Sequence, residues 1–347
     1  MTTMQETLRG MKFQAMLGKV ITLLLLGAGT VLVLMPLVWM LSTSLKSKSA
    51  STRFPPEWIP RDVRTVEIEG RDRYIYAIPV EGQIRELALL QKSGQMGIFV
   101  NPDNPDERYE LPVQTGERVF DVSIHWNNYL EAMTTVPFIK YLGNSTLIVV
   151  LTTIGTLVSS TLVAYGFARF RARWLNILFL VLLSTIMLPR QVTLIPTFLL
   201  FKKLGWYDTF LPLIVPTFFA GAWDVFLLRQ YIMTIPLELD DAARIDGCSP
   251  LGTLWYIILP QITPALATVA IFNSLWAWND FFYPLIYLQS PAKRTVALGL
   301  QAFQALYTRD THLMMAASTV ALLPCILIFF FAQRLFIQGV VVSGVKG

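Results

Sequence analysis

Long runs of apolar, uncharged residues recur along the chain and dominate its pattern. A run of about 20 such residues is long enough to cross a membrane as a helix. The pattern predicts an all-α polytopic membrane protein with six transmembrane helices, which are expected at Val20–Leu45, Tyr141–Ala168, Trp174–Pro189, Phe210–Leu228, Ile262–Leu288 and Leu313–Gln333. A seventh, shorter run, Gln191–Phe201, ends in two lysines, so we expect it to lie on or re-enter the membrane interface.

Between the first two runs the pattern changes to short alternating segments. Residues 65–69 and 74–80 alternate between apolar and polar positions, and Asn101–Pro105 is a cluster of turn residues. Segments of this kind are typical of β-strands separated by turns. We therefore predict a small β-rich external insertion at about residues 57–122, inside an external loop of residues 46–140. A cytoplasmic tail (1–19) and a first transmembrane helix (20–45) precede that loop, and a helical core (141–347) follows it.

Composition supports a membrane protein and excludes several functions. Of the 347 residues, 54% are hydrophobic and 15% are charged. The two histidines and two cysteines are too scattered for a metal site or a histidine-based catalytic pair, so no catalytic or metal-binding residue is expected. The net charge of +5 fits a protein beside anionic lipid, and no dense basic run indicates nucleic acid. No glycine-rich phosphate-binding loop is present, so ATP must bind elsewhere if it drives this protein.

The distribution of Lys and Arg sets the expected orientation, because short cytoplasmic loops carry an excess of both. With the N-terminus inside, the tails and inner loops hold ten of these residues. The two short outer loops hold six: Arg190, Lys202, Lys203, Lys293, Arg294 and Arg309. We therefore expect both termini in the cytoplasm, and the loop of residues 236–260 on the same side.

That loop carries four acids within nine residues, Glu238, Asp240, Asp241 and Asp246, and so must lie in water. Gly247 suits the left-handed end of a helix, and Ser249 followed by Pro250 suits the start of the next one. The sequence therefore predicts two short helices joined at a glycine. A rigid knob of this shape is suited to docking another protein.

The spacing of Asp241-Ala242-Ala243, Gly247, Ile257 and Leu259-Pro260 resembles the EAA motif. That motif marks the membrane-spanning permease subunits of binding-protein-dependent ABC importers. Asp241 stands where the family usually has Glu, which keeps the charge and shortens the side chain. An ordinary amphipathic loop helix is the alternative. The resemblance implies an ATPase-coupling loop formed by Glu238, Asp241, Ala242, Ala243, Gly247, Ser249, Ile257, Leu259 and Pro260.

The same resemblance implies an assembly in a bacterial or archaeal cytoplasmic membrane. Its other members would be a second homologous permease, two copies of an ATP-binding subunit that carry ATP and Mg, and an extracytoplasmic solute-binding protein. This chain would bind no cofactor and perform no bond chemistry. The likeness covers residues 127–347 and, weakly, the first span. From its placement alone, we expect the β-rich insertion to contact the solute-binding protein.

Aromatic and polar residues share one side of the fifth run. In a continuous helix, Phe272, Trp276, Asn279 and Tyr283 lie on one face. Such a face suits a sugar or polyol, because rings pack on C–H surfaces while polar groups bind hydroxyls. Anchoring at the membrane interface and ties between helices are the alternative. The candidate substrate path comprises Asn273, Trp276, Asn279, Asp280 and Tyr283.

The string Trp278-Asn279-Asp280-Phe281, with Pro284-Leu285 after it, also resembles the carbohydrate branch of these permeases. Three other functions stay open besides a sugar permease. One is an ABC permease for a non-sugar solute, and another is an ion-coupled secondary transporter that uses Asp224 and Asp280. The third is a membrane-anchored receptor or scaffold that acts through its β-rich insertion, which would leave the acidic loop and the polar face of the fifth run unexplained. Broken helices in an inverted repeat, the signature of such a transporter, are not evident in the sequence. Asp224 lies close to Arg229, and we expect it to tie a helix end near the inner side.

Overall fold

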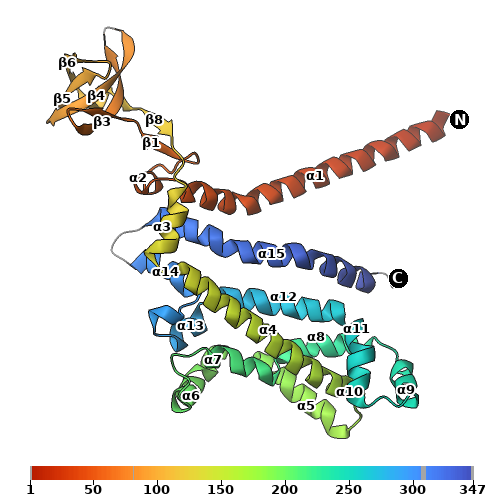
Figure 1. The fold of residues 1–347 in the computed structure, drawn as a ribbon. Coiled ribbons are helices and arrows are strands. Elements are labelled where there is room, and N and C mark those ends of the chain that lie inside the picture. The colour runs from red at the N-terminus through yellow and green to blue at the C-terminus, as the bar shows by residue number, and fades with distance from the viewer. Residues whose placement is uncertain (1, 81, 306–309, 345–347) are drawn as a thin grey trace. The chain divides into compact units, whose positions relative to one another are not determined.

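The computed structural model describes residues 2–80, 82–305 and 310–344 and divides into two compact units (Figure 1). One unit comprises Met1–Ala132 with Arg309–Thr319, and the other comprises Met133–Thr308 with Val320–Gly347. The last residues of the predicted core, 345–347, lie outside the described part of the chain, as do residues 306–309.

The first unit begins with helix α1 (Thr2–Ser44), so the polar segment ahead of the first apolar run is helical too. A short helix, α2 (Lys48–Ser51), follows. The end of α1 is held by Asn128 of helix α3 (Asn127–Thr135), whose side chain donates hydrogen bonds to the carbonyls of Ser44 and Lys46 at 2.8 and 2.7 Å. Asn128 is buried and satisfies backbone groups that every helix end leaves unpaired.

A small antiparallel sheet follows α2 and confirms the predicted β-rich insertion after the first helix. Its strands pair in the order β2-β3-β4-β5-β6, with β7 beside β3, while β1 and β8 form a separate two-stranded ladder. The side chains of Ile78, Leu87 and Phe99 are at most 1% exposed and form its core. The strands are β1 Arg61–Val63, β2 Thr65–Ile68, β3 Arg71–Val80, β4 Gln83–Ser93, β5 Met96–Asn101, β6 Asn104–Pro112, β7 Glu117–Arg118 and β8 Phe120–Val122.

The second unit is helical, and α4 (Phe138–Arg169) is its central element. Both α8 (Ala222–Met233) and α12 (Thr263–Asn279) pack along α4, and α5 (Arg173–Ser184) packs against α4 and α8 (Figure 1). The remaining helices are α6 Arg190–Lys203, α7 Leu211–Ile214, α9 Glu238–Ile245, α10 Pro250–Gly252, α11 Leu259–Gln261, α13 Phe282–Tyr287, α14 Val296–Ala305 and α15 Thr311–Gly344, which belongs to both units.

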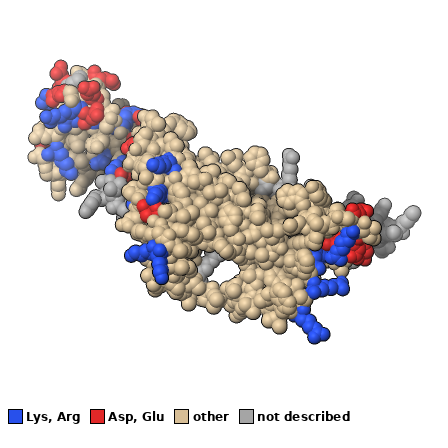
Figure 2. Space-filling view, turned by 60° about the horizontal axis from the view of Figure 1, so that its bottom comes forward, with Lys and Arg blue, Asp and Glu red and all other residues tan. Residues whose placement is uncertain are grey.

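Within the described residues, four segments are long and apolar enough to cross a membrane: Met16–Ser44, Phe138–Arg169, Leu211–Met233 and Thr311–Phe331. Two bent helix pairs bring the number to six if each pair is one span. One of these pairs places α6 at 100° to the helix before it. Figure 2 shows a broad uncharged surface on the helical unit, with charged side chains gathered toward its ends. The helical membrane fold predicted from the apolar runs is thereby confirmed.

The fourth predicted span, expected as one helix over Phe210–Leu228, is broken. After a 3₁₀ segment, Val215–Phe219, the chain turns at Ala220, whose φ is 55°. Ser159 of α4 bridges the break, because its hydroxyl donates to the Thr217 carbonyl at 2.9 Å and accepts from the Ala220 N–H at 3.1 Å. The sequence pattern did not predict this break, since the residues on both sides are apolar.

The fifth predicted span, Ile262–Leu288, is also broken. Helix α12 ends at Asn279, and Asp280 has extended backbone dihedrals. The Asp280 carboxylate then accepts hydrogen bonds from the backbone N–H groups of Phe282 and Tyr283, at 3.1 and 3.3 Å, and so caps α13. The prediction of one continuous helical face from Phe272 to Tyr283 is therefore wrong.

At the end of α4 opposite Arg169, the chain is fastened to the loop before α14. The Asn144 side chain donates to the carbonyls of Ala292 and Arg294, at 3.0 and 2.9 Å. The buried Ser145 hydroxyl accepts from the Val296 N–H at 2.9 Å. Asn144 thus has a structural role.

Asp208 also binds the loop before α14, through Gln289, Ser290 and Lys293. Hydrogen bonds from the side chain and backbone N–H of Ser290, with Lys293 and the Gln289 N–H, hold the pKa of the Asp208 carboxyl well below its usual range. The carboxylate therefore stays charged through the physiological pH range. The loop from Tyr287 to Val296 is consequently a fixed part of this end of the helical unit.

Gly155 allows the close approach of α4 to the 3₁₀ segment Val215–Phe219. A Cβ atom at Gly155 would lie 2.5 Å from the Thr217 hydroxyl and 2.7 Å from the Phe218 ring. We predict that Gly155→Val destabilises the protein by about 1–3 kcal/mol through overpacking. In detergent, its melting temperature should fall by roughly 5 °C.

Gly166→Val is the matched control, because a Cβ at Gly166 on the same helix meets no atom within 4 Å. Equal melting temperatures for the two variants would contradict the proposed close approach.

Candidate functional site

The acidic loop folds as an elbow, which we define as residues 236–261. Its first arm is α9, and its second arm consists of α10, a π-helical segment (Thr253–Ile258) and α11. The two arms meet at Gly247, whose φ is +82°. The structure thus confirms two short helices joined at a glycine. The elbow lies at the Arg169 end of α4 (Figure 1).

Local hydrogen bonds fix the angle between the arms. The Cys248 N–H donates to the Ala243 carbonyl at 2.8 Å and the Gly247 N–H to the Arg244 carbonyl at 3.0 Å, a Schellman closure of α9. The Ser249 hydroxyl accepts from the Gly252 N–H at 3.1 Å and caps the second arm. These are the roles that the sequence assigned to Gly247 and Ser249.

The outward surface of the elbow combines acids with apolar groups. Glu238, Asp241 and Ala242 are exposed, and the Asp241 carboxylate lies 3.5 Å from Arg244 on the same surface. Large apolar side chains of the elbow are also exposed: Ile245 in the first arm is 87% exposed, and in the second arm Trp255 is 67% and Tyr256 72% exposed. Exposed apolar side chains on a loop that also carries charges favour a surface that binds another protein.

The inward surface of the second arm belongs to the core of the helical unit. Ile258 is fully buried and Leu254 is 3% exposed. Ile257 and Leu259 are half-buried, whereas Pro260 is exposed. The buried cluster around them joins the elbow to three membrane helices through Ala164 and Tyr165 of α4, Val225, Leu228 and Ile232 of α8, and Ala265 and Val269 of α12.

The first arm contains one partner of a buried ion pair that the sequence pattern did not predict. Asp240, expected in water with the other acids, points inward, and one of its carboxylate oxygens lies 3.1 Å from Nε of Arg169 at the end of α4. The two side chains are 6% and 5% exposed. The Arg169 guanidinium also donates a hydrogen bond to the Ile235 carbonyl at 3.0 Å. The one available signal was the spacing that places Asp240 on the same side of α9 as Ala243, which is buried.

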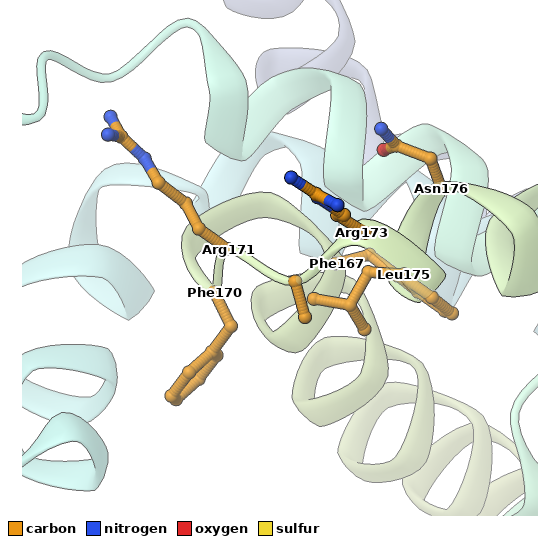
Figure 3. A pocket seen from close by; sticks show the side chains of 7 residues that line it. Phe167, Phe170, Arg171, Arg173, Leu175 and Asn176 are labelled. Carbon is orange, nitrogen blue, oxygen red and sulfur yellow. The ribbon is translucent and has the colours of Figure 1, made fainter.

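Beyond Arg169, the turn between α4 and α5 carries two further arginines. Arg171 and Arg173 are exposed and border a shallow pocket with Phe167, Phe170, Leu175 and Asn176 (Figure 3). In that view the Arg171 side chain extends away from the helices. Neither Arg171 nor Arg173 forms an ion pair in the described part of the protein. Exposed arginines at the end of an apolar helix are typical of its cytoplasmic end.

The five residues of the candidate substrate path do not share one face of a helix. Asn273 ties α12 to α4, because its amide donates to Thr153 at 3.0 Å and its carbonyl oxygen accepts from Thr156 at 3.3 Å. Asp280 caps α13, and Tyr283 stacks on Tyr287 within that helix with ring centroids 6.3 Å apart. Trp276 and Asn279 remain on an exposed face of α12.

Asp224 lies in the first turn of α8, directly after the break at Ala220. An acid there complements the positive end of the helix dipole. Two helix breaks, at Ala220 and Asp280, are present in the structure although they were not evident in the sequence. Within the residues that the structure describes, His, Cys, Asp and Glu form no group of three able to hold a metal ion.

Comparison with known proteins agrees with this geometry. The family described as "Binding-protein-dependent transport system inner membrane component" matches residues 157–342, over half of the chain. The arabinooligosaccharides transport system permease protein AraQ of Bacillus subtilis (strain 168) is 36% identical, over 60% of this chain and 74% of its own. The lactose transport system permease protein LacG of Rhizobium radiobacter is 32% identical, over 61% of this chain and 77% of its own.

Among solved structures, a bacterial ABC transporter involved in the import of the acidic polysaccharide alginate has a similar fold. The match has a TM-score of 0.65 and 19% sequence identity, and it covers 91% of this chain and 95% of the other. The chain therefore belongs to the family of binding-protein-dependent transport system inner membrane components: it is a multi-pass inner membrane permease subunit of an ABC importer, and not the subunit that hydrolyses ATP.

Proposed function

We propose that this permease imports a sugar or oligosaccharide and that the elbow couples its movement to ATP hydrolysis on separate subunits. The main support for the coupling role is the geometry of the elbow, because its exposed acidic and apolar residues are fixed to three membrane helices through one buried cluster. The substrate class is supported by relatives whose names specify arabinooligosaccharides, lactose and starch degradation products.

The assembly we propose contains two copies of an ATP-binding subunit, a second homologous permease and an extracytoplasmic solute-binding protein. ATP and Mg bind to the ATP-binding subunits, and this chain binds no cofactor. Both termini, the elbow and the Arg171–Arg173 turn lie on the cytoplasmic side of a bacterial or archaeal cytoplasmic membrane. The solute-binding protein is supported by a solved structure of similar fold, a bacterial alginate ABC transporter in complex with a pentasaccharide-bound periplasmic protein.

In this assembly the coupling residues have two kinds of role. Glu238, Asp241, Ala242, Gly247 and Ser249 form or shape the surface that docks on an ATP-binding subunit. Ala243, Ile257, Leu259 and Pro260 hold the arms in place. Closure of the ATP-binding subunits displaces the elbow, and the helices packed on it reorient between inward-open and outward-open states.

For the substrate path, we propose Trp276 and Asn279 of α12 as the residues of this chain that contact the sugar. Trp276 is 67% exposed and Phe272, one turn earlier, is 44% exposed, so the face has rings on which a sugar can stack. Asn273, Asp280 and Tyr283 position this face, since Asn273 binds α4, Asp280 caps α13 and Tyr283 stacks on Tyr287 within α13.

Gly247→Trp tests the coupling role. Its side chain would face open space on the docking surface, and the left-handed backbone at φ +82° disfavours it. We expect membrane insertion to be retained, while uptake of labelled arabinotriose or lactose into proteoliposomes holding the whole importer falls by at least tenfold.

Gly247→Asn is the matched control, because asparagine tolerates the left-handed region, and it should retain most of the uptake. Normal uptake by the tryptophan variant would refute docking at this surface. Failure of any ATP-hydrolysing subunit to co-purify with the unaltered chain in mild detergent would refute the importer assembly itself.

Trp276→Ala tests the substrate path. Loss of the stacking surface should raise the KM for sugar uptake by roughly tenfold, while basal ATP hydrolysis by the reconstituted importer stays unchanged. Trp174→Ala, which removes another exposed tryptophan from α5, serves as the control. An unchanged KM for each sugar transported would exclude Trp276 from the path.

The β-rich insertion is proposed to contact the solute-binding protein, and its geometry permits a clean deletion. Val63 pairs with Phe120 at the end of the β1–β8 ladder, so replacing residues 64–119 with Asn-Gly closes that ladder as a hairpin. We expect lower stimulation of ATP hydrolysis at limiting binding protein, with basal hydrolysis unchanged. Equal stimulation of the deleted and complete proteins would contradict this contact.

A further inference from the structure

The buried pair formed by Arg169 and Asp240 is not accounted for by stability. Removing two charges from water is unfavourable, and well-packed apolar residues often replace a buried ion pair without loss. The pair is nevertheless present, with its atoms 3.1 Å apart and its side chains only 5–6% exposed. It lies where the first arm of the elbow meets the end of α4.

The first arm has few other attachments. Of the residues of α9, only Asp240 and Ala243 are buried. Leu237, directly before the helix, is 45% exposed, and Leu239 is 40% exposed. The second arm, by contrast, is packed into the core through Leu254 and Ile258. Without the ion pair, α9 would be held to the membrane helices by the Ala243 side chain, by the Gly247 joint and by its connection to α8, in which Ile235 is buried.

On the other side of the pair, α4 is a long and rigid element. Its 32 residues span about 48 Å at 1.5 Å per residue. The Asn144 amide at its far end is fixed to two carbonyls of the loop before α14. A displacement of Arg169 along the helix axis would therefore reach the opposite side of the membrane, because both ends of α4 are fastened to other elements.

We propose that Asp240 and Arg169 are positioning residues that convert movement of α9 into movement of α4. This inference rests on the proposed coupling role of the elbow and adds the direction in which the movement is transmitted. Asp241, the adjacent acid, points outward and belongs to the docking surface, so the two neighbouring acids have different tasks. Asp241 receives the force, and Asp240 passes it to α4.

A probe at the far end of α4 tests the transmission directly and needs no identified solute. Gly143 is exposed, and a Cβ there meets no atom within 4 Å, so Gly143→Cys in a Cys248→Ser, Cys325→Ser background can carry a bimane fluorophore. In the importer assembled with its ATP-binding subunits, trapping with ATP and vanadate should shift the bimane emission. Asp240→Asn and Arg169→Gln should each reduce that shift at least fivefold while the ATP-binding subunits still co-purify.

Two variants separate transmission from a general loss of structure. Arg171→Gln removes an exposed arginine two residues from Arg169 and should leave the emission shift unchanged. The exchanged pair, Arg169→Asp with Asp240→Arg, should restore at least half of the shift. If the single variants do not assemble with the ATP-binding subunits, the exchanged pair is the decisive measurement.

The outcomes distinguish this inference from the function on which it rests. If the unaltered importer shows the shift and Asp240→Asn shows it equally, or if an assembled exchanged pair gives none, the transmission role is overturned. If the ATP-binding subunits do not co-purify with the unaltered chain, the proposed coupling function fails instead.

Discussion

The buried apolar cluster around Ile258 is the interaction on which the helical unit depends. Ile258 is fully buried between α4, α8 and α12, although it belongs to the elbow, which connects two spans, and Ile262 directly after the elbow is fully buried in the same cluster. Burying an aliphatic side chain of this size contributes about 1.5–3 kcal/mol, so the cluster holds the second arm of the elbow as firmly as a core helix is held. Connecting loops are normally mobile and variable. Here the connection is part of the core, and movement of its surface must move the helices.

A second constraint comes from the membrane, where each unpaired backbone group costs several kcal/mol. The protein nevertheless breaks two of its apolar segments, at Ala220 and Asp280. Each break is compensated by a nearby polar side chain: Ser159 binds the Thr217 carbonyl and the Ala220 N–H, and Asp280 caps α13. The two intramembrane acids, Asp224 and Asp280, both lie at helix starts. Their structural roles remove the observation that favoured an ion-coupled transporter.

Features with a local cause could be predicted from the sequence, and features with a distant partner could not. The spans, the β-rich insertion and the glycine joint all follow from periodicity, turn residues or caps within a few positions. The break at Ala220 depends on Ser159, which lies 61 residues earlier in the chain. Asp240 and Arg169 are likewise far apart in sequence, and within the four clustered acids only the spacing of Asp240 from Ala243 indicated that one of them is buried. Asn273 looked like a substrate ligand because the sequence does not show the threonines of α4 that bind it.

The proposed sugar path lies on an exposed face of α12, so it depends on what borders that face. A helix face exposed to lipid carries apolar side chains, and Phe272 and Trp276 alone would satisfy that requirement. Asn279 lies on the same exposed face and donates a hydrogen bond within its own helix, to the Leu275 carbonyl at 2.8 Å. The proposed sugar path requires that this face border water or a protein neighbour in place of lipid. A second permease that covers its edge would enclose the path between the two chains, and the elbow at the Arg169 end would then connect that shared path to the ATP-hydrolysing subunits.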